Sequence, residues 1–521
     1  MKRTKLYIAV SLIAASMGLA SCDSYLDKLP DNRMELKSPD DVSKLLVGAY
    51  SEGSAAYLLE MYSDNTNEYK NTGWTAYNRF QDQAYNWTEL TESDNEGTQM
   101  IWDQFYSCVR TANEAIAFIE KQSNKDDYKT QLGEALMCRA YSVFYLANVF
   151  CRAYDPATAD KELGLPYPTE PDYALVTKYE RGTLAQLYAK IDADIQEALP
   201  LLTNTYEHPK FHFNTLSGNA FAARFYLYYR KYDAAIKYAT AVLGTSPASK
   251  LRDWSTWNSL SANAMVQPNA YVSSTNQANL MLQVAYSVWG YNSVLTGCKY
   301  SHGARISQTE TLEANGPWGD SQRAAGYTVF YNNSYSQHCL RKVPLLIEYT
   351  DVQAGTGYAH SEMSVFNTDE TLLVRAEAYA LKGMYDKALE DVNTEMSKFM
   401  PNARALTLAG IQEFYGNIDY YTPANPTPIK ELHVSPALES TTQEPLIQCI
   451  LQLRRLITMH DGLRMQDVKR YGMTIYRLRL NESNQLLNVT DTMDADDPRQ
   501  AIQIPSDVIN AGLTPNPRNA K

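Results

Sequence analysis

Apolar residues recur every three to four positions over several long stretches of the chain, which is the spacing of one helix face. The pattern predicts helices over residues 38–51, 99–121, 127–153, 183–199 and 444–471. In the stretch 127–153 apolar side chains lie on nearly all sides, as is typical of a helix buried within a protein. Two shorter helices, 217–229 and 233–243, are predicted as a tight pair. The fold is therefore predicted to be mainly α-helical.

This short helical pair is repeated 153 residues later in the sequence. Ala223, Tyr226, Tyr232, Asp233, Ala235 and Ile236 recur as Ala376, Tyr379, Tyr385, Asp386, Ala388 and Leu389. Small alanines at matched places allow two antiparallel helices to approach closely, and such repeats are typical of tetratricopeptide-like helical pairs. Arg139-Ala140 matches Arg375-Ala376, so the stretch 99–153 is predicted to be a third, degenerate copy.

Two stretches interrupt the helical pattern and are rich in Gly, Ser, Asn, Tyr and Trp, namely 62–96 and 245–367. Within the second, residues 284–288 and 342–349 could form short strands. A long irregular stretch inside a compact domain is usually functional. We therefore expect a helical-pair scaffold with a long, loop-rich insertion. The scaffold should cover about 97–245 and 368–475, within a body of 38–521.

The N-terminus has the pattern of a secretory signal. Three basic residues precede the uncharged run Leu6–Leu19, and Leu-Ala-Ser-Cys22 follows. The run is shorter than the roughly 20 apolar residues that span a bilayer. Leu-Ala-Ser-Cys resembles a bacterial lipobox, whose cysteine is acylated, for example with palmitate, and becomes the new N-terminus. We expect 1–21 to be a lipoprotein signal peptide, Cys22 to be lipidated and 22–37 to be a tether; an ordinary signal peptide with a chance cysteine is the alternative.

Composition and cysteine spacing make several classes of function unfavourable for this protein. The net charge of −12 over 521 residues disfavours a nucleic-acid partner, which would require clustered Lys and Arg. The seven cysteines include no CxxC pair, so metal or redox spacing is absent. The 39 Tyr and 7 Trp residues offer rings that suit sugars and peptides, although helical cores account for many of them.

Catalytic motifs are also absent: the sequence has no GxSxG, P-loop or HExxH. His208 and His212 have metal-like spacing, but Pro209 disfavours a helix that presents both. An acidic cluster near the C-terminus could hold Ca²⁺, with a solvated tail as the preferred alternative. Its members are Asp491, Asp494, Asp496 and Asp497. We expect no enzyme activity and no other cofactor.

Several short motifs occur in a fixed order along most of the chain. They are Cys22 to Asp27 after the lipobox, Trp102 with Tyr106 and Ala112-Asn113, Arg139-Ala140-Tyr141 with Leu163 to Pro166, Leu373 to Tyr379 with Tyr385-Asp386 and Ala388, Arg454-Arg455, Asp461 to Arg464, Asp467, Arg470 to Gly472, and Ile504-Pro505. In this order they resemble the SusD/RagB family of outer-membrane nutrient-binding lipoproteins of Bacteroidetes. Asp461 replaces the family's usual Glu and Tyr471 its usual Trp.

The resemblance implies a scaffold of four tetratricopeptide-like units and a looped ligand face. It also implies a lipid-anchored protein at the cell surface that binds an oligomeric nutrient and passes it to a SusC-like TonB-dependent barrel in the outer membrane. The ligand face is implied to come from 62–96 and from the middle of 245–367, mainly 270–335.

Rings with nearby amide, acid or guanidinium groups in these stretches are the candidate ligand contacts. They are Asp64, Asn65, Asn67, Trp74, Tyr77, Trp87, Trp289, Tyr291, Trp318, Arg323 and Tyr327. A glycan is the preferred ligand, because the family is known mainly for glycans and both stretches mix Trp and Tyr with Asn, Asp and Ser. The same architecture binding a peptide, and a surface hydrolase on a helical scaffold, are the alternatives.

Overall fold

The computed structural model describes residues 36–68, 78–92, 96–171, 179–261, 265–292, 299–319, 328–332, 335–481 and 483–518. Cys22 and most of the expected signal and tether therefore lie outside the described residues. Among the described helices, none is both long enough and apolar enough to cross a membrane.

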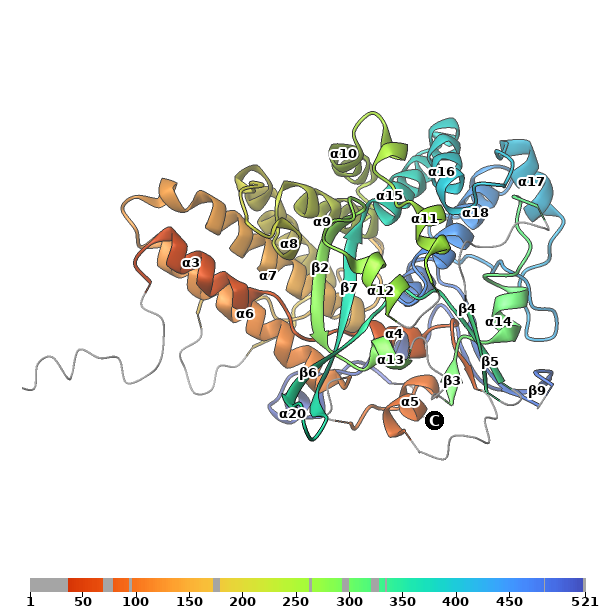
Figure 1. Ribbon diagram of the computed structural model, residues 1–521, viewed down its shortest axis with the longest axis horizontal. Coiled ribbons are helices and arrows are strands. Elements are labelled where there is room, and N and C mark those ends of the chain that lie inside the picture. Colours follow the sequence, from red (N-terminus) through yellow and green to blue (C-terminus); the bar gives the residue numbers. More distant parts are fainter. Residues whose placement is uncertain are drawn as a thin grey trace, which may run out of the picture.

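Helices form most of the described structure (Figure 1). They are α3 (Pro39–Leu46), α4 (Ala56–Tyr62), α5 (Arg79–Tyr85), α6 (Thr98–Glu120), α7 (Lys129–Phe150), α8 (Leu184–Ala198), α9 (Thr215–Tyr228), α10 (Tyr232–Leu243), α11 (Trp254–Ser259), α12 (Val266–Val272), α13 (Trp289–Asn292), α14 (Ala304–Thr309), α15 (Thr368–Leu381), α16 (Tyr385–Phe399), α17 (Leu408–Gly416), α18 (Gln443–Ile457), α19 (Arg464–Arg470) and α20 (Ser506–Asn510). The mainly α-helical fold predicted from the sequence is confirmed.

Strands are short and antiparallel. They are β1 (Asn67–Glu68), β2 (Asn279–Tyr286), β3 (Tyr300–Ser301), β4 (Thr328–Asn332), β5 (Tyr335–Cys339), β6 (Leu345–Asp351), β7 (Thr356–Asn367), β8 (Ile475–Leu480) and β9 (Leu486–Met493). The largest described sheet has the order β2-β7-β6, and β1-β3, β4-β5 and β8-β9 form two-stranded pairs. The strands expected near 284–288 and 342–349 correspond to β2 and β6.

The predicted helical repeat is confirmed in three dimensions. Helices α9 and α10 pack as one pair, α15 and α16 as another, and α10 packs against α15 (Figure 1). Local sequence explains where these helices begin. The side chain of Asn214 accepts from the backbone N–H of Ser217 before α9, and that of Asn367 accepts from Glu370 N–H before α15. Such side-chain caps satisfy donors that a helix N-terminus leaves without partners.

An ion pair shows how the third copy is built. In the pair α15–α16, Arg375 donates through Nε and Nη2 to the two carboxylate oxygens of Asp391, at 2.8 and 2.7 Å. Arg139 on α7 makes the same forked contact, at 2.6 and 2.8 Å, with Asp194 on α8. The counterpart of α15–α16 is therefore α7–α8 rather than the stretch 99–153. The proline-rich connector between α7 and α8 hides this pairing in the sequence.

The helical block predicted over 444–471 is divided into α18 and α19. Gly462 lies in the break with φ +74, and a Cβ at this position would stand 2.7 Å from the Cα of Ala56. Glycine allows both the left-handed backbone and the close approach to α4. The break brings α4, α18 and α19 together beneath the looped part of the molecule.

The C-terminal stretch is packed against the helices and is not a solvated tail. The backbone N–H of Ile502 donates to Val149 O at 3.1 Å, and Asn516 Nδ2 donates to Phe150 O at 2.9 Å. Both acceptors belong to the last turn of α7, whose carbonyls have no partners within the helix. The C-terminal stretch therefore supplies hydrogen-bond donors to the last turn of α7.

Candidate functional site

The two interrupted stretches meet in space, as the resemblance implies. Strand β1 from the first stretch pairs with β3 from the second, and Tyr85 of α5 stacks on Tyr300 with 4.3 Å between ring centroids. At the surface, Lys299 Nζ lies 3.5 Å from Glu68 and 3.3 Å from Asp82. We call this part of the molecule, residues 62–92 with 265–367, the looped face; in Figure 1 it includes α5, α13, α14 and β3.

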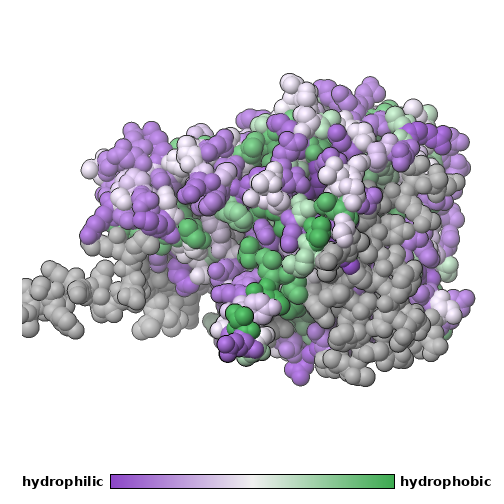
Figure 2. Space-filling view, in the orientation of Figure 1, coloured by the Kyte–Doolittle hydropathy of each residue, from purple (hydrophilic) through white to green (hydrophobic). Residues whose placement is uncertain are grey.

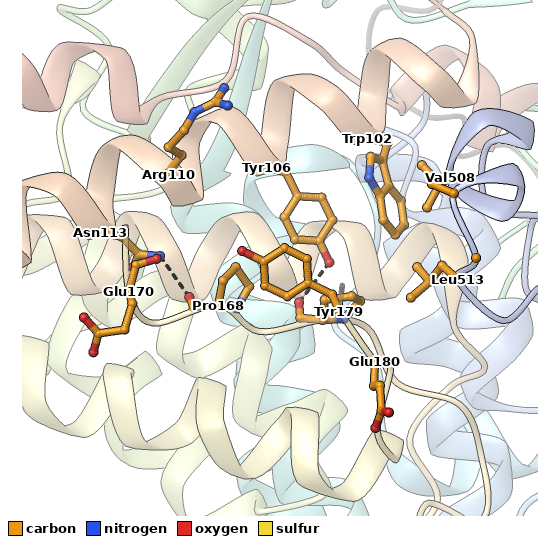
Figure 3. Close-up of a pocket in the computed structure, with 13 residues that line it drawn as sticks. Trp102, Tyr106, Arg110, Asn113, Pro168, Glu170, Tyr179, Glu180, Val508 and Leu513 are labelled. Atoms are coloured by element: carbon orange, nitrogen blue, oxygen red, sulfur yellow. Dashed lines mark hydrogen bonds between the residues drawn. The ribbon is translucent and has the colours of Figure 1, made fainter. Parts of the chain in front are cut away.

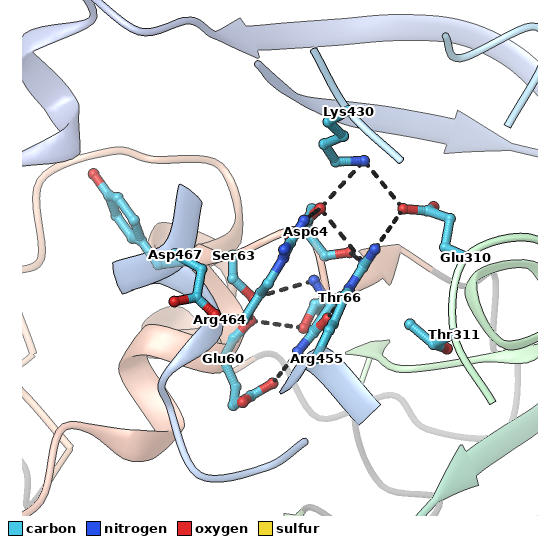
Figure 4. A network of polar contacts seen from close by, with 12 residues as sticks. Glu60, Ser63, Asp64, Thr66, Glu310, Thr311, Lys430, Arg455, Arg464 and Asp467 are labelled. Atoms are coloured by element: carbon cyan, nitrogen blue, oxygen red, sulfur yellow. Dashed lines mark hydrogen bonds and ion pairs between the residues drawn. The ribbon is translucent and has the colours of Figure 1, made fainter. Parts of the chain in front are cut away.

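A buried network of charges fixes the looped face to the scaffold (Figure 4). Arg464 Nε and Nη2 donate to Asp64 Oδ1 and Oδ2 at 2.7 and 2.8 Å, while Lys430 Nζ lies 3.2 Å from Oδ2. Arg455 reaches the carboxylates of Asp64 and Glu310, at 3.5 and 3.0 Å. Burial alone would raise the pKa of Asp64, but its three cations together hold that pKa well below its usual value.

Asp64 and Asn65 were expected to face a ligand, but they belong to this interior network. Asn65 Nδ2 donates to Glu60 at 3.1 Å, and Asn65 Oδ1 accepts from Arg455 Nε at 2.8 Å. Asn67 is also buried, within β1. The side chains of Asp64 and Asn65 have no exposed polar group to offer a ligand. The expectation of ligand contact fails here because cations supplied by the distant α18 and α19 cannot be recognised from local sequence.

Three of the candidate tryptophans are buried and anchor loops to the protein interior. Their exposed fractions are 4% for Trp87, 3% for Trp289 and 2% for Trp318. Trp87 Nε1 donates to Tyr62 O at 2.9 Å, and Trp289 Nε1 donates to His460 O at 2.8 Å. A buried indole whose N–H has a carbonyl partner is satisfied within the protein. The expectation that these rings face solvent is therefore wrong in this structure.

Two of these indole rings pack closely against neighbouring residues. Trp289 stacks on Tyr57 with 4.7 Å between ring centroids, and Trp318 covers Gly316. A Cβ at position 316 would stand 2.2 Å from the indole of Trp318. Trp74, Tyr77, Arg323 and Tyr327, and the side chain of Tyr291, lie outside the described residues, so their expected ligand contacts stay predictions.

Arg477 of β8 closes the end of α4 under the looped face. Its guanidinium donates to the backbone carbonyls of Met61, Tyr62 and Ser63, at 2.8 to 2.9 Å. The rings of Tyr85 and Trp87 lie 4.3 and 4.1 Å from its central carbon. Burial lowers the pKa of Arg477 to about 10, because the main chain and the rings surround the cation.

The sheet of the looped face carries a partly exposed cluster of rings that the sequence did not reveal. Tyr286 of β2 pairs in register with His360 of β7, and their ring centroids are 4.3 Å apart. Tyr358 lies nearly perpendicular to Tyr286 and is 56% exposed, and His360 Nε2 lies 3.0 Å from Glu348 of β6. We call Tyr286, Glu348, Tyr358 and His360 the ring cluster. The signal for it was the alternation of Tyr358, His360 and Glu362 along one strand.

Apolar side chains surround the ring cluster. Figure 2 shows hydrophobic residues gathered over β2 and β7, and Val284, Val288 and Ile347 are among the exposed apolar side chains of this area. A face of this composition has ring surfaces for the apolar side of a ligand and a few polar groups for its hydroxyls. Such a combination is typical of ligand sites.

Two of the acidic residues near the C-terminus form ion pairs with an arginine of the same chain. Arg499 pairs with Asp491 at 2.5 Å and with Asp497 at 2.6 Å. In the described part of the chain no group of three His, Cys, Asp or Glu residues could hold a metal ion. The guanidinium of Arg499 therefore pairs with two of the four carboxylates that were considered as Ca²⁺ ligands.

A separate cavity of about 470 Å³ lies between α6, the connector that leads to α8, and α20 (Figure 3). Trp102, Tyr106 and Tyr179 contribute rings to its wall, and none of the sequence candidates lines it. The expectation that Trp102 is a core residue fits its 7% exposure, although its edge reaches the cavity.

Comparisons with known proteins agree with this architecture. Residues 24–227 match a SusD-like family described as "Starch-binding associating with outer membrane". SusD-like protein P38 of Formosa agariphila is 27% identical over 270 residues, which are 50% of each chain. The match thus spans about half the length of this curated relative.

Solved structures cover nearly the whole chain. A SusD superfamily protein of Bacteroides vulgatus is 18% identical with a TM-score of 0.66, over 93% of this chain and 100% of its own. One from Bacteroides thetaiotaomicron is 19% identical with a TM-score of 0.60, over 92% and 100%. A SusD-like carbohydrate binding protein of Bacteroides vulgatus is 14% identical with a TM-score of 0.65, over 91% and 97%. The N-terminal part of the chain thus matches a SusD-like family model, and nearly the whole chain has the fold of SusD superfamily structures.

Proposed function

We propose that this protein binds an oligosaccharide at the outer membrane and delivers it to a SusC-like TonB-dependent transporter, without chemically changing it. The observation that carries the proposal is the ring cluster on the sheet of the looped face, in which Tyr358 is exposed and stands against Tyr286 and His360. Rigid exposed rings cover the CH face of a sugar at little cost in conformational entropy. The family description, which names starch and the outer membrane, and the carbohydrate-binding relative support the same class of ligand.

Replacing Tyr358 by Ala should weaken oligosaccharide binding about tenfold, because a stacked ring contributes roughly 1 to 1.5 kcal/mol. Isothermal titration calorimetry with uncharged oligosaccharides (α-glucans, β-glucans, xylans, mannans and galactans) measures this effect. Tyr358→Phe keeps the ring and should retain most of the affinity. The melting temperature of both variants should stay near that of the parent, because Tyr358 is exposed.

Unchanged affinity in Tyr358→Ala would remove the ring cluster from the site. If a tryptic digest of casein bound and no glycan did, the ligand would be a peptide. Release of shorter products from the bound glycan, followed by chromatography, would contradict the assignment as a binding protein.

We propose lipidation of Cys22 as the means of membrane attachment. Two or more acyl chains on one residue give stable anchoring, whereas one chain gives marginal binding. Cys22→Ala should therefore move the protein from the membrane fraction to the soluble fraction of lysed cells, while glycan affinity in solution stays unchanged. A Cys22→Ala protein that still sediments with outer membranes would contradict this anchor.

A further inference from the structure

The cavity between α6, the connector and α20 has a rigid wall. Tyr106 OH donates to Pro166 O at 2.9 Å, and Asn113 Nδ2 donates to Pro168 O at 3.0 Å (Figure 3). The amide oxygen of Asn113 accepts in turn from Arg139, at 2.9 Å. Because Asp194 fixes Arg139, these contacts clamp the connector to α6. A cavity that exists before binding spares the ligand the cost of ordering it.

The wall offers little main chain for recognition. Pro166 and Pro168 have no N–H, and the carbonyls of both already accept from Tyr106 and Asn113. An extended peptide is usually held by main-chain hydrogen bonds along a strand edge. The cavity lacks such an edge at this wall, so a ligand there must be recognised through side chains.

Those side chains are rings and charges of both signs. Tyr179, which is 40% exposed, lies in front of Tyr106, and Trp102 stands beside Val508 and Leu513 at one end (Figure 3). Arg110, Glu170 and Glu180 border the cavity, and no ion pair among the described residues joins them to each other or to another side chain.

The charges favour an uncharged ligand with many hydroxyls. Carboxylates accept hydrogen bonds, and a guanidinium donates up to five. Hydroxyl groups can do both, so a sugar can hydrogen-bond with a bordering charge of either sign, whereas a ligand of one charge is attracted by one kind of border charge and repelled by the other. The volume of about 470 Å³ falls in the range of roughly 300–1,000 Å³ that is usual for small-molecule sites.

From these observations we infer that this cavity is a second saccharide site, which binds an uncharged sugar unit or short oligosaccharide against Tyr179. The inference rests on the proposed function for the class of ligand but not for the place of binding. A second site on another part of the surface would let one glycan chain be held at two points, which increases its overall affinity without a new kind of contact.

Calorimetry and tryptophan fluorescence with the same uncharged oligosaccharides test the inference. Wild-type protein should show two binding events, one of which changes the fluorescence of Trp102, as judged against Trp102→Phe. Tyr179→Ala should weaken that event at least tenfold and leave the other, and Tyr179→Phe should retain it. Raising the salt concentration should change it little, because an uncharged ligand releases no counterions.

Tyr420→Ala is the matched control, since Tyr420 is 41% exposed and lies outside the cavity. If Tyr179→Ala binds like wild type while Tyr358→Ala does not, the second site is wrong and the proposed function stands. If Tyr179→Ala alone loses binding, the cavity stands and the ring cluster falls. No binding by the wild type overturns both, and tighter binding of a polyuronate or of casein peptides in the cavity overturns the uncharged saccharide.

Discussion

Asp64→Asn is expected to lower the free energy of unfolding by about 3–5 kcal/mol, the usual cost of removing one partner from a buried ion pair. The substitution removes the carboxylate that pairs with Arg464, Arg455 and Lys430, of which Arg455 and Lys430 keep a contact with Glu310. Like charges in a site of low dielectric repel strongly when their counter-charge is gone. Urea denaturation followed by circular dichroism measures the loss.

Asp40→Asn is the matched control, because the ion pair of Asp40 with Lys44 is exposed to solvent. Exposed pairs contribute roughly 0–1 kcal/mol, so this variant should unfold near the wild type. Equal effects of the two substitutions would show that the network around Asp64 carries no special weight.

The same network sets a dependence on pH. The pKa of Asp64 is lower in the folded protein than in the unfolded chain. Its contribution to stability is therefore present above about pH 4, the unfolded value, and is lost as the pH falls through the folded pKa. Wild type should lose more stability than Asp64→Asn on acidification below pH 4. A parallel loss in both proteins would place the acid-sensitive groups elsewhere.

Arg477→Met is expected to cost about 3 kcal/mol, because the buried carbonyls of Met61 and Ser63 lose the guanidinium as donor and that of Tyr62 keeps only the indole of Trp87. The methionine fills much of the space between Tyr85 and Trp87, so the loss reports mainly on hydrogen bonds. Arg477→Lys should be intermediate, since an ammonium group lacks the planar fork that serves several acceptors between two rings.

Arg479 lies two residues further along β8 and is exposed, so Arg479→Met should change stability by less than about 0.5 kcal/mol. Thermal unfolding of the four proteins in parallel separates the effects. A loss in Arg479→Met as large as in Arg477→Met would indicate that strand β8, rather than the contact with α4, is responsible.

The scaffold could be predicted from sequence because its information is local. Alanine spacing and capping residues within some 30 positions define α9–α10 and α15–α16, and both pairs are found as expected. The pair α7–α8 was assigned incompletely, since its Arg139–Asp194 contact crosses a connector that has no helical period. Periodicity identifies helices well and their partners less well.

The looped face was predicted less completely from the sequence than the scaffold. The meeting of its two stretches was predicted correctly from the resemblance, but its rings were not. Trp87 and Trp289 look like surface residues in irregular sequence, whereas each indole N–H finds a carbonyl inside the fold. Rings that reach solvent occur instead on β2 and β7, where Tyr358 is exposed and Tyr286 is half-buried. Lack of periodicity thus says nothing about burial.

The contacts of Asp64 also bear on the order in which the molecule can form. Its partners Arg455 and Arg464 follow it by 391 and 400 positions, and Arg477 joins the end of α4 from further still. Pairings between such distant parts of a chain form late and slow folding. The N-terminal helices therefore cannot reach their final state before the C-terminal part of the polypeptide has been synthesised. A fragment that ended at residue 227 would leave the buried carboxylate of Asp64 without its two arginines.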